Sequence, residues 1–185
     1  MSKDVMLSIR PKWCEKIASG KKTIEVRKTK TKLETPFKAY IYCTMPDTRD
    51  PHNILELHGA DGKIRKANGK VIGEFTCDRI YELAPLNHAP DDVEKQACLT
   101  REEIVDYLKG TGYGWHISNL KIYDAPKKLG EFWRDCLEYS ELSTNCWSCE
   151  NVCGDGDETD CNTDGRLYLH RPPQSWCYVK EIDNG

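Results

Sequence analysis

The alternation of apolar and polar positions near the start of the chain predicts a strand, a short helix and a second strand. Residues 5–10 and 22–29 alternate as half-buried strands do, and residues 11–19 between them form an amphipathic helix. Pro11 suits a first helical position, and Gly20 suits the left-handed residue that follows a helix end. We therefore expect the chain to turn from helix to strand just after Gly20.

The same kind of pattern predicts further strands along the rest of the chain. Runs that are rich in aromatic and β-branched residues occur at 38–44, 70–83, 115–123 and 176–179. Gly73 lies inside one of these runs and marks a bend or bulge of the kind that lets a sheet curl.

Two further helices and one long insertion are also expected. Thr100 and Glu103 form a capping-box pattern that opens a helix, and a short helix is expected from Asp124 to about Trp133. Residues 46–69 contain several Pro, Asp and Gly positions with hairpin turn signals, which predicts a long polar insertion. Short strands, few helices and irregular connections favour an α+β fold with a closed mixed β-barrel over a doubly wound sheet.

The strand that follows the first helix concentrates charge in the pattern Gly20-x-Lys22-x-x-Glu25-x-Arg27. In an extended chain Thr23, Glu25 and Arg27 share one face. Lys22 lies on the opposite face with the two apolar residues of the strand, so it either reaches water or is held desolvated beside a carboxylate. The alternative is an exposed Glu25–Arg27 pair that contributes little to stability.

The composition is that of a soluble protein with one domain. Of the 185 residues 38% are hydrophobic and 31% charged, and no apolar run approaches the roughly 20 residues that span a bilayer. Residues 1–4 lack the layout of a secretory signal, so we expect a cytoplasmic location and no membrane partner. A net charge of -3 argues against binding long duplexes through overall charge. Any nucleic-acid contact must therefore be local, at the basic runs 21–32 or 63–70.

The ten cysteines divide into two groups. Six are dispersed singly and are expected to be small buried hydrophobic residues: Cys14, Cys43, Cys77, Cys98, Cys136 and Cys177. The other four lie in a polar segment too short for its own core: Cys146, Cys149, Cys153 and Cys161. Four thiolates around a structural zinc ion would order this segment and leave no ligand position open for catalysis. An iron–sulfur cluster and free thiols are the alternatives, and His170 could replace one cysteine.

The charged motif resembles the signature of the ASCH domain, a small β-barrel of the PUA-like superfamily. Three other blocks in the same order are similar to that family, namely Val5–Pro11 as the leading strand, Lys70–Phe75 as a central strand and Pro172–Val179 as the closing strand. The resemblance implies a single α+β domain over residues 1–185, built as a mixed β-barrel of about six strands with two or three flanking helices. Residues 137–165 would form a four-cysteine insertion before the closing strand.

The resemblance also implies a cleft beside the motif strand that accepts RNA or a single modified nucleoside. Such bases are recognised by stacking on aromatic rings and by hydrogen bonds to their edges, while cations hold phosphate. Stacking candidates are Trp13, Trp115 and Trp176. The implied binding residues are Arg10, Trp13, Lys21, Lys22, Glu25, Arg27, Gln174, Ser175 and Trp176.

Some ASCH proteins that this chain resembles are amidohydrolases that remove the acetyl group from acetylcytidine with a lysine, a threonine and a glutamate. Lys22 matches the lysine, and Lys22 with Glu25 would be catalytic if this chain is such an enzyme. The position of the threonine in those enzymes is occupied by Glu25 in this chain. Thr23 could replace that threonine only from a position two residues earlier. The distal glutamate would be Glu102 or Glu103.

Two other classes of function stay open at this point. A ribonuclease that acts through Lys22 and Arg27 is a second enzymatic alternative. A protein-interaction module, in which the barrel and residues 46–69 dock a protein partner, is the alternative to both binding and catalysis. The sequence does not indicate the oligomeric state.

Overall fold

The computed structural model describes residues 3–46, 53–84, 90–135 and 166–181 of the chain. In these residues the strands are β1 (Asp4–Ile9), β2 (Ile24–Arg27), β3 (Phe37–Cys43), β4 (Glu56–His58), β5 (Ile64–Lys66), β6 (Lys70–Cys77), β7 (Ile80–Leu83), β8 (Gly112–His116), β9 (Ser118–Lys127), β10 (Phe132–Asp135), β11 (Arg166–Tyr168) and β12 (Trp176–Glu181). The helices are α1 (Pro11–Ala18), α2 (Val93–Ala97), α3 (Arg101–Leu108) and the short 3-10 helix η1 (Leu129–Glu131).

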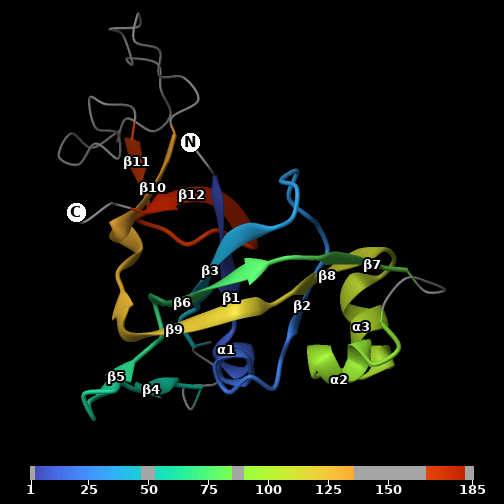
Figure 1. Cartoon of the computed structure of the whole chain (residues 1–185), viewed down its shortest axis with the longest axis horizontal. Coiled ribbons are helices and arrows are strands. Elements are labelled where there is room, and N and C mark those ends of the chain that lie inside the picture. Colours follow the sequence, from blue (N-terminus) through green and yellow to red (C-terminus); the bar gives the residue numbers. More distant parts are fainter. Residues whose placement is uncertain (1–2, 47–52, 85–89, 136–165, 182–185) are drawn as a thin grey trace, which may run out of the picture.

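Most strands pair in one large mixed sheet, and a smaller sheet lies beside it (Figure 1). The seven-stranded sheet has the order β11-β10-β12-β1-β3-β6-β9, and the three-stranded sheet has the order β2-β8-β7. The chain passes between these two sheets four times, from β1 to β2, from β2 to β3, from β6 to β7 and from β8 to β9. The sheet-rich α+β fold with mixed pairing is confirmed, although backbone pairing in the described residues does not join β2 to the large sheet.

Strand β1 lies in the middle of the large sheet. It runs parallel to β3, with Ile9 opposite Cys43, and antiparallel to β12, with Leu7 opposite Trp176. Residues 5–9 are all buried, which is typical of a strand that is covered on both faces. Helix α1 follows β1 directly on the way to β2, so the charged motif lies close to the central strand.

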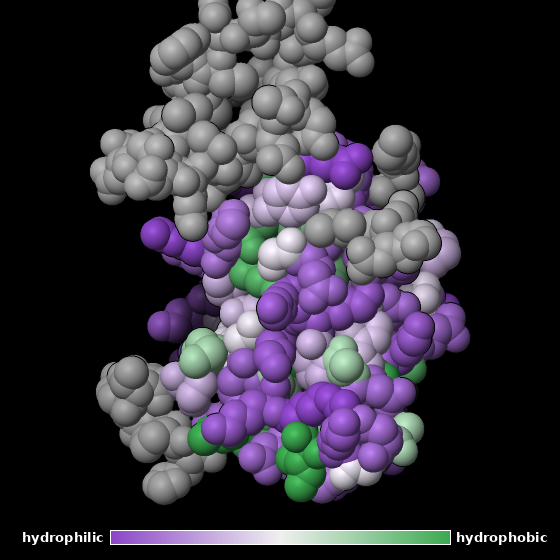
Figure 2. All heavy atoms as spheres, turned by 90° about the vertical axis from the view of Figure 1, so that its left-hand side faces the viewer, coloured by the Kyte–Doolittle hydropathy of each residue, from purple (hydrophilic) through white to green (hydrophobic). Residues whose placement is uncertain are grey.

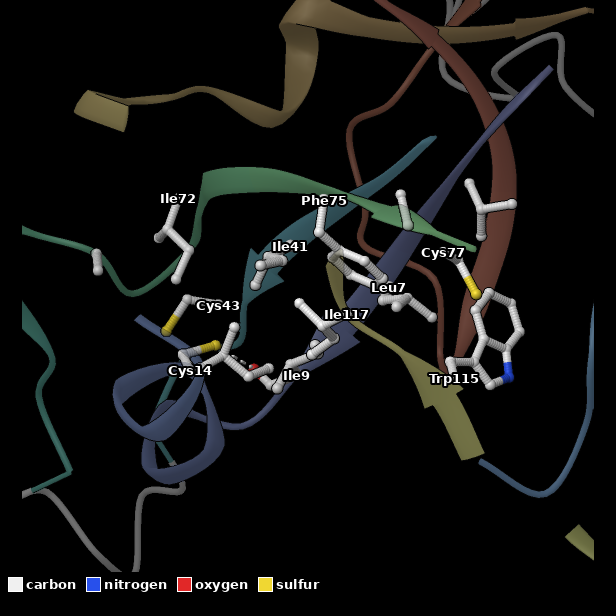
Figure 3. Packing of buried hydrophobic residues seen from close by; sticks show 14 of the residues in the cluster. Leu7, Ile9, Cys14, Ile41, Cys43, Ile72, Phe75, Cys77, Trp115 and Ile117 are labelled. Carbon is white, nitrogen blue, oxygen red and sulfur yellow. Dashed lines mark hydrogen bonds between the residues drawn. The ribbon is translucent and has the colours of Figure 1, made fainter. Parts of the chain in front are cut away.

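The main core gathers apolar side chains from the sheets and from α1 (Figure 3). Trp115 is fully buried and packs edge-on against Phe37, with the ring centroids 5.5 Å apart. Of the six dispersed cysteines, three are buried as predicted: Cys14, Cys43 and Cys77. Cys98 and Cys177 are half-buried, which corrects that prediction for these two, and Cys136 lies outside the described residues.

Several local predictions are confirmed. Thr100 and Glu103 form the capping box of α3, with both reciprocal hydrogen bonds present. The polar insertion contains the hairpin β4–β5, whose turn holds Gly62 at a φ of 75°. The pairing of β6 with β9 shifts register next to Gly73, as expected for a bulge. A side chain at Gly73 would meet the Lys121 carbonyl at 2.4 Å, which explains why glycine is required there.

Other predictions are wrong. The expected helix from Asp124 to Trp133 is absent, because β9 continues to Lys127 and only the short η1 follows. Pro126 is compatible with this strand since β9 is at the edge of the sheet, where no neighbour requires its N–H. The stretch 115–123 is two strands rather than one, and helix α2 was not expected at all.

Hydrophilic side chains cover most of the described surface on the side that Figure 2 shows, and hydrophobic ones lie singly between them. Scattered exposed apolar residues of this kind are normal for globular proteins. Across the described ranges, none of the helices combines the length and the apolar character needed to cross a membrane.

Candidate functional site

The corner between α1 and β2 turns Lys22 into the interior. Helix α1 ends at Ala18, and Gly20 adopts the left-handed conformation with a φ of 71°. The backbone N–H of Lys22 then donates to the Lys16 carbonyl at 3.0 Å, which keeps the chain folded back along the helix. Regular strand geometry begins only at Ile24, so the alternation of faces does not extend back to Lys22. Lys22 therefore meets Glu25 instead of pointing away from it.

Three charged side chains are buried together at this corner, and we call them the motif cluster: Lys22, Glu25 and Arg27. Lys22 is 2% exposed, and its Nζ lies 3.4 Å from Glu25 Oε2. Arg27 Nε lies 3.2 Å from Glu25 Oε1, at an angle that gives an ion pair but no hydrogen bond. The interpretation of Glu25 and Arg27 as an exposed surface pair is wrong.

The Lys22 ammonium is desolvated but well coordinated. Its Nζ donates to the Ala97 carbonyl at 2.7 Å and lies 5.1 Å from the centroid of the Trp13 ring. Burial lowers the pKa of Lys22 from its ordinary value, although the adjacent Glu25 carboxylate acts in the opposite direction. A lysine with a lowered pKa beside a carboxylate is a common arrangement at functional sites.

Arg27 connects the two sheets where their strands are not paired. One of its terminal nitrogens donates to the Ser8 carbonyl at 2.6 Å, and the other contacts the Ser175 carbonyl and hydroxyl oxygens at 3.4 Å each. Ser8 is on the central strand β1 and Ser175 directly precedes β12. This guanidinium thus holds β2 against the large sheet, in addition to forming one wall of the site.

A cavity of about 460 Å³ adjoins the motif cluster. It lies between the end of β1, helices α1 and α3, strand β2 and the loop before β12. Its lining residues are Ser8, Ile9, Arg10, Trp13, Lys22, Glu25, Val26, Arg27, Thr44, Leu99, Tyr107, Pro172, Pro173 and Gln174. The wall thus combines aromatic rings, hydrogen-bonding groups and more basic than acidic side chains.

Six of the predicted binding residues line this cavity: Arg10, Trp13, Lys22, Glu25, Arg27 and Gln174. Lys21 is exposed outside it, and Ser175 lies behind the wall as a partner of Arg27. Trp176 donates through Nε1 to the Thr29 hydroxyl at 2.9 Å and packs on Trp115, so neither tryptophan faces the cavity. Trp115 as a stacking residue is therefore a wrong prediction, because its ring fills the core.

Sequence reasoning missed the contribution of the α2–α3 region to the wall. Tyr107 and Leu99 line the cavity from this side, and Tyr107 is 44% exposed. The available signal was an aromatic residue on the polar side of α3, since a large exposed ring on a helix has no role in that helix's own packing.

The other residues proposed for amide hydrolysis are not brought to the cavity. Thr23 donates through its hydroxyl to Gln96 Oε1 at 3.2 Å, and Glu103 is held in the capping box with Thr100. Glu102 is exposed on α3. Only Lys22 and Glu25 of that hypothetical set meet within the site.

The predicted zinc ligands Cys146, Cys149, Cys153 and Cys161 lie outside the described residues. Among the residues that are described, no group of three or more His, Cys, Asp or Glu side chains is arranged to hold a metal ion. A structural zinc in segment 137–165 stays a prediction. Elemental analysis together with a visible absorption spectrum distinguishes zinc from an iron–sulfur cluster.

Comparison with solved structures finds ASCH proteins with low sequence identity. The crystal structure of ASCH from Zymomonas mobilis is 19% identical, with a TM-score of 0.48 over 69% of this chain and 74% of that one. A serine-to-alanine mutant of that protein is 19% identical with a TM-score of 0.48, covering 69% and 75%. A tyrosine-to-phenylalanine mutant is 18% identical with a TM-score of 0.47, covering 69% and 77%.

The family relationship rests on the sequence itself. A search of curated proteins finds no match. The family model described as the ASCH domain matches residues 7–153, which contain the charged motif, the central strands and most of the cavity wall. The chain therefore belongs to the ASCH domain family.

Proposed function

We propose that the cavity beside the motif cluster binds one nucleobase, presented by RNA or by a modified nucleoside. The observation that carries this proposal is the buried Lys22–Glu25 pair in the wall of a cavity of about 460 Å³ that also contains aromatic rings. Cavities of roughly 300 to 1,000 Å³ with a few convergent polar groups are typical of small-molecule sites.

The chemistry of the wall suits the edge of a base. The Glu25 carboxylate can accept a hydrogen bond from an exocyclic amine, and the Lys22 ammonium can donate to a ring nitrogen or carbonyl oxygen. Tyr107 and Trp13 offer ring surfaces next to these groups. Bases that are not paired in a duplex are recognised by such combinations of stacking and edge contacts.

The test is isothermal titration of the purified protein with the four ribonucleosides, with acetylcytidine and with a short single-stranded RNA. Tyr107→Ala is expected to weaken binding about 10-fold, since base–aromatic stacking contributes about 1–3 kcal/mol. Val105→Ala is the matched control, because Val105 is an exposed residue of the same helix and does not line this cavity. If no nucleoside or RNA binds, or if both variants behave alike, the proposal is wrong.

A second candidate is hydrolysis of an acylated base, favoured by the lowered pKa of Lys22 next to Glu25. In such a reaction the uncharged lysine accepts a proton from water, and the resulting hydroxide attacks the amide carbonyl. The protonated lysine gives this proton to the leaving nitrogen as the C–N bond breaks, which yields the free amine and a carboxylic acid that ionises to the carboxylate. Release of cytidine and acetate from acetylcytidine, abolished in Lys22→Met, would establish this activity, whereas binding without product supports the binding function alone.

A further inference from the structure

Three lysine side chains gather around the ring of Trp13, which is part of the cavity wall. The ammonium groups of Lys12, Lys16 and Lys22 lie 4.7, 5.8 and 5.1 Å from the centroid of the same indole ring. Arg10, which is exposed, adds a fourth cation on the adjoining part of the cavity wall.

Three of these four cations, like many exposed basic residues of this chain, have no carboxylate partner over the described ranges, whereas some basic residues elsewhere do. Ion pairs join Arg65 to Asp61 at 2.6 Å, Lys180 to Asp135 at 2.8 Å and Arg101 to Glu94 at 2.9 Å. Over the described ranges, Lys22 pairs with Glu25, but no ion pair involves Arg10, Lys12 or Lys16.

The local sequence also leaves this charge uncompensated. Between residues 10 and 21 the only acidic residue is Glu15, which is exposed and forms no ion pair in the described structure. Like charges held this close repel one another, and an anion bound between them removes that repulsion. The net charge of the whole chain is -3, so this concentration of positive charge is a local property.

We propose that Arg10, Lys12 and Lys16 form a phosphate subsite at the mouth of the cavity, next to Trp13. This inference rests on the proposed function, because it places the phosphate beside a base that occupies the cavity. The ligand is then a nucleotide unit, either a mononucleotide or one residue of a single strand, and not a free nucleoside. Arginine and lysine are the side chains that most often hold phosphate oxygens.

The experiment compares a nucleoside with its 5′- and 3′-monophosphates and with a short RNA that contains the same base. We expect at least one phosphorylated ligand to bind about 10-fold more tightly than the nucleoside, as charge-assisted hydrogen bonds predict. In Lys12→Gln/Lys16→Gln this gain is lost, while affinity for the nucleoside is unchanged. A gain shown by a monophosphate indicates a mononucleotide ligand, whereas a gain shown only by the RNA indicates a single strand. For a single strand, the logarithm of the binding constant should also fall with the logarithm of the salt concentration, with a slope of about 0.7 for each phosphate contacted.

The matched control is Lys63→Gln/Lys66→Gln, which removes the same charge from exposed lysines at the β4–β5 hairpin, away from the cavity. We expect it to retain the gain. If the nucleoside and all phosphorylated ligands bind with equal affinity, the phosphate subsite is wrong but the base-binding cavity is not. The same conclusion follows if the two double variants lose equal amounts of affinity for the phosphorylated ligand. Failure of every ligand to bind would instead overturn the proposed function, and the subsite with it.

Discussion

Two groups of ionisable side chains are buried or partly buried in this protein, and they differ in what surrounds them. The first is the motif cluster next to the cavity. The second, which we call the tyrosine cluster, consists of Asp4, Tyr40, Glu74, Tyr123 and Glu181. Side chains of β3 alternate between two separate cores, with Ala39 and Ile41 in one and Tyr40 in the other, so Tyr40 lies on the opposite face of the large sheet from the main core.

The tyrosine cluster is built from neutral donors and carboxylate acceptors. The Tyr40 hydroxyl lies 3.2 Å from Asp4 Oδ2 and 3.1 Å from Glu181 Oε2, and Tyr123 donates to Glu74 at 2.6 Å. Burial, followed by these carboxylates, raises the pKa of both tyrosines, so the hydroxyls keep their protons. These bonds connect β3 to β1 and to β12, and β9 to β6, within the large sheet.

The motif cluster instead consists of three charged groups at the wall of a cavity, with basic side chains in excess. A buried charge has lost its water, so one that faces a cavity can interact with a ligand that enters there. A hydroxyl that already hydrogen-bonds to carboxylates has no such free capacity. The tyrosine cluster therefore has a structural role, and the position of the motif cluster at a cavity supports the binding role that we propose for it.

The largest effect is expected for Glu25→Ala. Removal of this carboxylate leaves Lys22 and Arg27 buried without their counterion, which should lower the free energy of unfolding by about 3–5 kcal/mol. Urea denaturation measures the loss, and Glu102→Ala, at an exposed position on α3, serves as the control with a change within about 0.5 kcal/mol. A loss below about 1 kcal/mol would mean that the motif cluster behaves as an exposed ion pair.

A smaller effect is expected for Tyr40→Phe, which removes one hydroxyl from the tyrosine cluster. The free energy of unfolding should fall by about 1–2 kcal/mol, because Asp4 and Glu181 lose the hydroxyl whose single proton lies within hydrogen-bonding distance of both. Nucleoside affinity should not change, since Tyr40 is not in the cavity wall. Tyr81→Phe is the control, as its hydroxyl forms no hydrogen bond within the described residues. Weakened ligand binding in Tyr40→Phe alone would remove the functional distinction between the two clusters.

The smallest effect is a pH dependence that originates at Asp4. Burial raises the pKa of Asp4 above its ordinary value of 3.8, so the folded protein keeps this proton at pH values where the unfolded chain has released it. The stabilising contribution is therefore complete below pH 3.8 and is lost as the pH rises through the folded-state pKa.

The measurement for Asp4 is the free energy of unfolding of the wild type and of Asp4→Asn from about pH 3 to about pH 7. The asparagine cannot lose a proton, so the wild type should become less stable relative to the variant as the pH increases. The opposite slope would show that attraction to Lys38, which acts to lower this pKa, prevails over burial.

Local signals in the sequence were sufficient for much of the fold. The capping box at Thr100 and the corner at Gly20 depend on interactions within a few residues, and both are predicted correctly. The bulge at Gly73 is also predicted correctly, although its close contact is with Lys121 on β9. The meeting of Lys22 with Glu25 was one of two outcomes left open by the pattern. The choice between them depended on where regular pairing of β2 begins, which its partner β8 determines.

Features that depend on distant packing could not be predicted. Tyr107 reaches the cavity because α3 packs over β2, and its exposed ring alone does not indicate which part of the molecule it contacts. Trp115 resembles any other strand tryptophan in the sequence, yet it is fully buried and packs against Phe37 of β3 and Trp176 of β12. The residues from Asp124 to Lys127 have a helix-start pattern, but pairing with β6 fixes them as strand.

The central position of β1 affects how the protein is made. Residues 4–9 leave the ribosome before the other strands, but one of their two neighbours in the sheet is β12, which is synthesised more than 160 residues later. Until then one edge of β1 exposes unpaired backbone groups, and Arg27 lacks its contact at Ser175. The nascent chain therefore depends on late, long-range contacts to complete the sheet, a topology that folds slowly.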